Sequence, residues 1–163
     1  MKIKSALLVA LLGAVSIPQS ALAVETPPGW HRTTDDTGIT LTAIDDDNRE
    51  VKLDISPLLS NDDNKSAAEY VQEFMDSSEN STEMQVTHRG EIQKKEKRAA
   101  ITFQAKFGEI PAIITFVTCP VKKNAWRSIF VIMKDDVNVR KRHQKTVNKI
   151  IEAQYAEDMA SQK

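Results

Sequence analysis

The stretch from Arg98 to Met133 constrains the fold more than any other part of the chain. It contains three apolar, β-rich runs separated by two turn-like breaks, Gly108 to Pro111 and Pro120 to Asn124. In the first run apolar residues alternate with polar ones, which is typical of a half-buried strand. The alternating residues are Ala99, Ile101, Phe103, Ala105 and Phe107. Strands joined by short turns pair antiparallel, so the stretch predicts a three-stranded meander at the centre of one sheet.

The residues before the meander predict a hairpin, a helix and a weaker strand. Gly38 to Ile44 and Glu50 to Ile55 are the two strands of the hairpin. The helix begins after Ser66, because Ser66 and Glu69 form a capping-box pattern ahead of an apolar stripe. Met84 to Gln93 is the weaker strand, and its Gly90 suggests a β-bulge.

After the meander, a final helix begins beyond Asn138 and carries a row of lysines opposite its apolar face. The chain is therefore expected to be an α+β protein. Its antiparallel β-sheet should have about six strands and two helices, in the order β-β-α-β-β-β-β-α. One domain is expected over residues 24–156, and residues 157–163 are expected to fray because they show no packing pattern.

The N-terminus has the three parts of a secretory signal peptide. Lys2 and Lys4 are the positive region, Ala6 to Val15 is the apolar region, and Ala21-Leu22-Ala23 supplies the small residues of a cleavage site. The apolar run is shorter than the about 20 residues that span a membrane. We therefore expect residues 1–23 to be removed after Ala23, leaving a periplasmic protein. No cysteine lies directly after the apolar region, so lipid attachment is not expected there.

Charge is distributed unevenly along the expected mature chain. From Val24 to Gln93 there are five lysine and arginine residues against sixteen acidic ones, whereas from Lys94 onward there are fifteen against seven. Separate acidic and basic surfaces that steer charged partners are expected. The candidate partner-binding residues are Asp45, Asp46, Asp47, Asp62, Asp63, Lys94, Lys95, Lys97, Arg98, Arg140, Lys141 and Lys145.

These charged groups have alternative interpretations. The acidic clusters are solvated turns, a docking surface or calcium ligands, although Asp45 to Glu50 lacks the glycine and closing glutamate of an EF-hand loop. The basic residues are a solvated face, or they bind an acidic protein or an anionic lipid headgroup. Export from the cytoplasm argues against nucleic acid as a partner.

The sequence offers no recognisable catalytic or cofactor motif. His31, His88 and His143 lack metal-ligand spacing, and there is no nucleophile elbow, dinucleotide fingerprint or phosphate-binding loop. No cofactor, metal or catalytic residue is therefore expected. Cys119 is the only cysteine, so the fold has no internal disulfide. Its thiol is interpreted as a small buried hydrophobe, with an intermolecular disulfide or a reactive thiol as the alternatives.

The predicted element order, together with Gly29-Trp30 ahead of the first strand, resembles the PsbP/Mog-type superfamily, which includes DcrB-like bacterial envelope proteins. The resemblance covers roughly Gly29 to Tyr155. It implies a binding or assembly role and carries over no functional residue. DcrB-like proteins have a lipidated cysteine that this chain lacks, so their membrane anchoring does not carry over.

The first functional hypothesis is thus a non-enzymatic periplasmic protein that binds another protein, as an inhibitor or immunity protein or as an envelope accessory factor. The second is a carrier that binds a small ligand or metal on the sheet face opposite the helices. A third, a hydrolase, requires Cys119 to be accessible beside a histidine.

Overall fold

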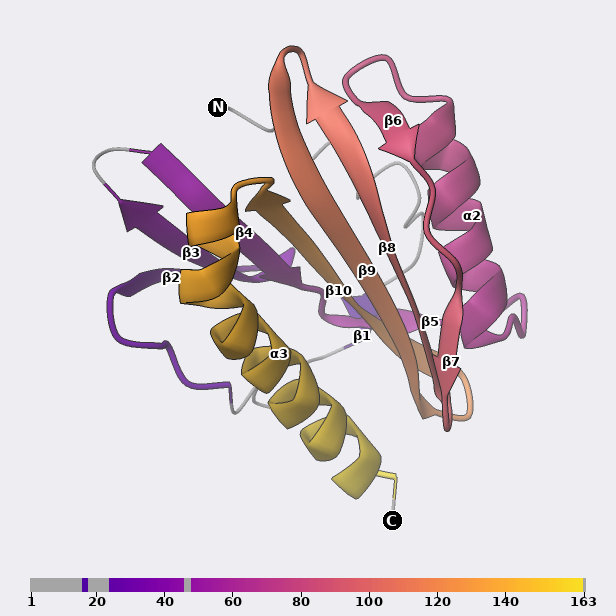
Figure 1. Cartoon of the computed structure of the whole chain (residues 1–163). Coiled ribbons are helices and arrows are strands. Elements are labelled where there is room, and N and C mark those ends of the chain that lie inside the picture. The colour runs from indigo at the N-terminus through magenta and orange to yellow at the C-terminus, as the bar shows by residue number, and fades with distance from the viewer. Residues whose placement is uncertain (1–15, 18–23, 46–47, 163) are drawn as a thin grey trace.

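The computed structural model describes residues 16–17, 24–45 and 48–162. The expected signal peptide, apart from residues 16–17, and its cleavage site lie outside the described residues. Figure 1 shows the described elements. They are β1 (Ser16–Ile17), β2 (Trp30–Asp35), β3 (Gly38–Asp45), β4 (Asn48–Ile55), β5 (Leu58–Ser60), α2 (Ala67–Glu79), β6 (Gln85–His88), β7 (Gln93–Lys95), β8 (Arg98–Phe107), β9 (Ile110–Lys122), β10 (Ala125–Lys134) and α3 (Val137–Ala160).

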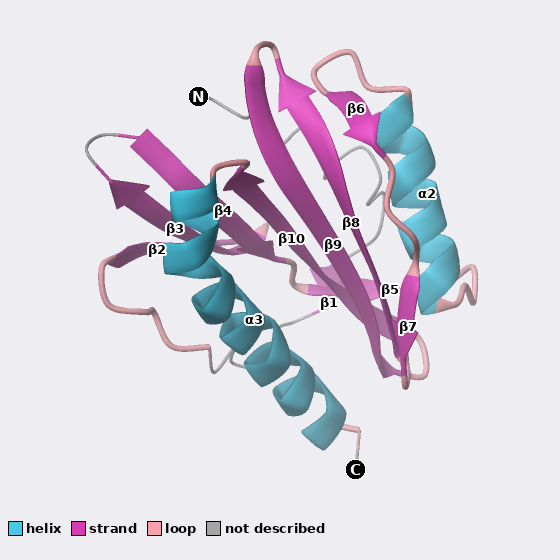
Figure 2. Cartoon of the chain, viewed as in Figure 1, coloured by secondary structure: helices cyan, strands magenta, loops and turns pink. Residues whose placement is uncertain are grey.

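The protein is α+β, with two described helices and one large antiparallel sheet (Figure 2). Neighbouring strands follow the order β2-β3-β4-β10-β9-β8-β6. The predicted meander forms the strands β8, β9 and β10, and its last strand joins the hairpin β3–β4 through β4. The prediction of a central meander is therefore confirmed.

The expected strand number and order are wrong, because the described residues form ten strands when the two-residue β1 is counted. Strand β2 lies ahead of the first expected strand, which began at Gly38. Its threonines favour strands, and an edge strand exposed on both faces needs no apolar alternation. The weak strand expected over residues 84–93 splits into β6 and β7, which both pair with the long strand β8.

Helices α2 and α3 cover opposite faces of the sheet. In β10, Ile129 and Val131 belong to the core under α3, whereas Phe130 and Ile132 belong to the core under α2. Helix α3 contacts β4, β9 and β10, and α2 contacts β6, β8 and β9 (Figure 1). The carrier hypothesis assumed a sheet face free of both helices. That assumption is wrong, because period-two alternation in β10 supplies an apolar row to each face.

Capping side chains fix the starts of both helices. The hydroxyl of Ser66 accepts the N–H of Glu69 and the Glu69 carboxylate accepts the N–H of Ser66, which is the predicted capping box. The Asp136 carboxylate accepts the N–H groups of Asn138 and Val139 at the start of α3. Inside the core, the ring of Phe74 stacks on Phe116 with centroids 4.0 Å apart, which holds α2 on β9.

The end of α3 does not fray at Glu157 as expected. The helix continues to Ala160, and Asp158 is only 4% exposed. The carboxylate of Asp158 pairs with the buried guanidinium of Arg127 on β10. The buried face of α3 therefore continues beyond its apolar residues in polar ones. A search for apolar periodicity in the sequence does not reveal this last part of the helix.

Candidate functional site

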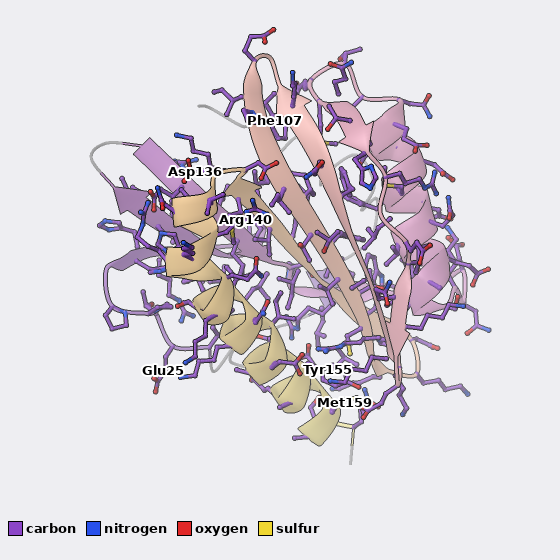
Figure 3. All side chains as sticks on the ribbon, viewed as in Figure 1. Glu25, Phe107, Asp136, Arg140, Tyr155 and Met159 are labelled. Carbon is purple, nitrogen blue, oxygen red and sulfur yellow. The ribbon has the colours of Figure 1, made fainter. Side chains whose placement is uncertain are left out.

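The predicted basic residues separate into two groups in the structure. Lys94, Lys95, Lys97 and Arg98 lie at the β7–β8 turn, which contacts the C-terminal part of α3. Arg140, Lys141 and Lys145 lie in the first part of α3. Figure 3 shows the separation through its labels, since Arg140 lies near the start of α3 and Tyr155 near its end. With a rise of about 1.5 Å per residue, the two groups are about 20 Å apart along the helix.

A groove lies beside the β7–β8 turn, with a volume of about 500 Å³. Three of the described residues that line the groove are lysines, and the described lining contains no acidic residue. We call it the lysine groove. It is lined by Lys97, Pro120, Val121, Lys122, Lys123, Ser161 and Gln162.

Hydrogen bonds through one glutamine hold the walls of the lysine groove together. The Lys97 ammonium donates to Oε1 of Gln162 at 3.0 Å, and Nε2 of Gln162 donates to the carbonyl oxygen of Pro120 at 2.7 Å. The β7–β8 turn, strand β9 and the residues after α3 are thus joined. Because the partner of Lys97 is a neutral amide, the positive charge of Lys97 is not neutralised.

Arg98 has a structural role that the sequence did not suggest. Its side chain is 11% exposed, it forms an ion pair with Glu152, and it lies 4.6 Å from the centre of the Tyr155 ring. The hydrogen bond from Arg98 lowers the pKa of Glu152. Arg98 therefore fixes the β7–β8 turn to α3, and it is not an open docking residue.

Glu96 adds a second link between this turn and α3. Its carboxylate accepts the hydroxyl of Tyr155 at 2.6 Å, and this hydrogen bond is the main reason why the pKa of Tyr155 rises to about 12. The backbone of Glu96 has a φ of 54°, which is uncommon for a residue other than glycine. Such a conformation persists where the surroundings hold it, and the contact with Tyr155 does so here.

Two of the predicted acidic residues, Asp62 and Asp63, have described side chains, and both are exposed. Asp46 and Asp47 lie outside the described residues, and Asp45 is described only as the last residue of strand β3. Asp62 accepts the hydroxyl of Ser60, and Asp63 lies 3.4 Å from the Lys65 ammonium. Lys65 also pairs with Glu73 at 2.7 Å, so one ammonium group is shared between two carboxylates.

The loop that carries Asp62 and Asp63 lies beside the turn that carries Lys123. The N–H of Asn61 donates to the carbonyl oxygen of Asn124 at 2.9 Å. The structure therefore brings the acidic loop before α2 and the basic β7–β8 turn to the same end of the sheet.

Sequence reasoning missed Lys122 and Lys123. Both were assigned only to the turn after the second strand of the meander. Alternate turns of an antiparallel meander lie at the same end of the sheet, so the turns β7–β8 and β9–β10 are neighbours. Counting charges over alternate turns would have revealed these two lysines.

A second polar cluster joins α3 to β4. The β3–β4 pairing shifts register between Ala43 and Ile44, which leaves Glu50 as an extra residue at a β-bulge. Its buried carboxylate contacts Arg142 and lies 2.5 Å from Nε2 of His143. Burial raises the pKa of Glu50, but hydrogen bonds from His143 and Arg142 outweigh burial and lower it. The ring of Trp30 packs edge-on against His143.

The metal-binding and hydrolase hypotheses can be compared with the side chains of the described residues. The side chains there contain no group of three or more His, Cys, Asp or Glu placed to hold a metal ion. Cys119 is buried, and burial raises the pKa of its thiol to about 12. A thiol with such a pKa forms little thiolate at neutral pH, which argues against the hydrolase hypothesis.

The comparisons with known proteins assign no family to the chain. No protein-family model and no curated protein matches the chain. Among solved structures, the chain is similar to LpqN, described as involved in cell envelope biogenesis of Mycobacterium tuberculosis. The identity is 10%, the TM-score is 0.48, and the match covers 80% of this chain and 75% of LpqN. This likeness carries no functional assignment, and the PsbP/Mog-type resemblance stays a prediction.

Within the part of the chain that the structure describes, neither α2 nor α3 is long and apolar enough to cross a membrane.

Proposed function

We propose that this protein is a non-enzymatic protein of the cell envelope that binds an acidic segment of another protein in the lysine groove. The observation that carries the proposal is the convergence of Lys97, Lys122 and Lys123 on one groove whose described lining residues include no carboxylate. Like charges held close together repel, so an anionic partner that enters the groove is favoured electrostatically.

The shape of the groove supports a segment of chain as the ligand. A volume of about 500 Å³ is large enough for a few side chains. Its polar lining, which combines lysines with Ser161 and Gln162, suits carboxylates and backbone carbonyls. The signal peptide expected from the sequence supports an envelope location, where an inhibitor or immunity protein and an assembly factor would both work by such contacts.

An NMR titration with a short polyglutamate peptide tests the groove directly. We expect amide shifts at Lys97, Val121, Lys123 and Ser161, and a loss of affinity of about tenfold in Lys122→Gln/Lys123→Gln. The matched control is Lys94→Gln/Lys106→Gln, which removes the same charge at two exposed residues outside the groove lining. Equal losses in the two variants would show a response to net charge alone and contradict the proposal.

Photocrosslinking in periplasmic extract then tests for a natural partner. A photoreactive residue in place of Lys123 should capture an acidic protein that the same residue in place of Lys106 does not. Capture should weaken when Lys97 and Lys122 are replaced by glutamine. Capture of the same proteins from both positions would contradict a specific interface at the groove.

A further inference from the structure

Helix α3 carries a second basic surface that is separate from the lysine groove. Lys141, Lys145 and Lys149 are spaced four residues apart, so they lie on one side of the helix, and all three are exposed. We call this row the lysine stripe. Across the described part of the chain, the side chains of these lysines have no hydrogen bond or ion pair with another residue.

The carboxylates nearest to the lysine stripe along the helix are occupied elsewhere. Asp136 caps the start of α3 through the N–H groups of its first turn. Glu152 is paired with Arg98. Neither carboxylate compensates the stripe, so the three like charges repel one another at the spacing of one helical turn.

The opposite side of α3 is already used in the core. Val147, Ile150 and Ile151 pack against the sheet, so the helix has no free apolar face to insert into a membrane. Any contact made through the stripe is therefore electrostatic. Figure 1 shows α3 on the side of the sheet opposite α2, and the three stripe lysines are exposed on this helix. The stripe thus offers positive charge and no apolar surface, which is complementary to the phosphate headgroups of an anionic bilayer.

We propose that the lysine stripe docks the protein on the surface of a bilayer that contains anionic phospholipid. Each lysine held near such a surface contributes enough to change binding several-fold, so three together change it about a hundredfold. Arg140 lies at the same end of the helix, but its guanidinium is 3.8 Å from a carboxylate oxygen of Asp135, so the proposal rests on the three lysines alone. Docking through α3 leaves the lysine groove, at the other end of the helix, to bind its own partner.

Vesicle flotation tests this docking. The purified protein is mixed at low salt with vesicles of phosphatidylcholine containing phosphatidylglycerol, or with vesicles of phosphatidylcholine alone. We expect binding to the anionic vesicles only, and its loss at high salt. The variant Lys141→Gln/Lys145→Gln/Lys149→Gln should bind about a hundredfold more weakly. Circular dichroism should show an unchanged fold, because glutamine favours helices about as well as lysine does.

A matched triple variant separates the stripe from general charge. Lys94→Gln/Lys95→Gln/Lys106→Gln removes three exposed lysines from β7 and β8 and should keep its binding to anionic vesicles. Equal loss in both triple variants, equal binding to neutral vesicles, or no binding at low salt would each overturn the proposal. Polyglutamate binding by the stripe variant should be unchanged, so the failure of this proposal is distinguishable from the failure of the lysine groove.

Discussion

Arg127 and Asp158 form an ion pair buried between β10 and the end of α3. Nε of Arg127 lies 3.0 Å from one carboxylate oxygen of Asp158 and 3.2 Å from the other. Nη1 of Arg127 also donates to the carbonyl oxygen of Ser56 at 2.7 Å, and Gln154 donates to Asp158 at 3.1 Å. One guanidinium thus joins the end of β4 to the last turns of α3.

Replacing one member of this pair should destabilise the fold strongly. Asp158→Ala leaves the Arg127 charge buried without its counter-ion, which costs about 3–5 kcal/mol of the free energy of unfolding. The control Glu91→Ala removes an exposed carboxylate and should cost less than about 0.5 kcal/mol. Urea unfolding measures both.

The double variant Arg127→Met/Asp158→Leu tests the cause. It should recover most of the loss, because an apolar pair avoids the cost of burying two charges. If it is as unstable as Asp158→Ala, the loss comes from packing and not from the unpaired charge.

The same pair shows where prediction from the sequence stops. The meander was predictable because alternation in β8 is a local signal that directly reflects burial. Arg127 lies inside an apolar run, Asp158 lies in a polar tail, and 31 positions separate them. Only the packing of α3 on β10 brings them together. The apolar periodicity therefore predicted the first and middle turns of α3 but not its last turns.

The candidate site was also predictable only where its signal is local in the sequence. Lys97 was identified because it belongs to a local run of basic residues, whereas Lys122 and Lys123 become its neighbours only through the order of the strands. Arg98 was assigned to the surface although Glu152 and Tyr155 bind it. Charge along the chain thus predicted that a basic surface exists, and topology decided which lysines form it.

Gly90 should tolerate no side chain, although its backbone is not in the left-handed region. A Cβ atom there would lie 1.8 Å from the carbonyl oxygen of Thr102 on β8. Gly90→Ala should therefore cost about 3 kcal/mol of stability, since the clash is with backbone. Gly108→Ala is the control, because its φ is +61° but no atom lies within 4 Å of the added Cβ. It should cost only about 1 kcal/mol. Thermal unfolding of the two variants should show this order, and the reverse order would contradict a close approach of Gly90 to β8.

Cys119 should react slowly in the folded protein. Its side chain is buried, and its pKa of about 12 leaves almost no thiolate at pH 8. Ellman's reagent should label it rapidly only after urea is added. Thr87→Cys in a Cys119→Ala background gives a matched exposed thiol on β6, which should react at once. Rapid labelling of Cys119 without urea would revive the reactive-thiol hypothesis.

Glu50 should make stability depend on pH in the acid range. Burial alone would raise its pKa, but His143 and Arg142 lower it below the ordinary value of 4.5. A carboxyl with a lower pKa in the folded state stabilises the fold at pH values above 4.5, and this stabilisation is lost as the pH falls from 4.5 through the folded-state pKa.

The variant Glu50→Gln isolates this contribution. At pH 7 it should lose about 1–3 kcal/mol, the range for hydrogen bonds to a charged group, and its stability should fall less steeply below pH 4.5 than that of the wild type. Glu109→Gln, at an exposed turn, should follow the wild-type curve. The free energy of unfolding of the wild type and of both variants, measured between pH 3 and pH 7, tests this prediction. A constant difference between Glu50→Gln and the wild type over that range would show that shape, and not charge, holds Glu50 against α3.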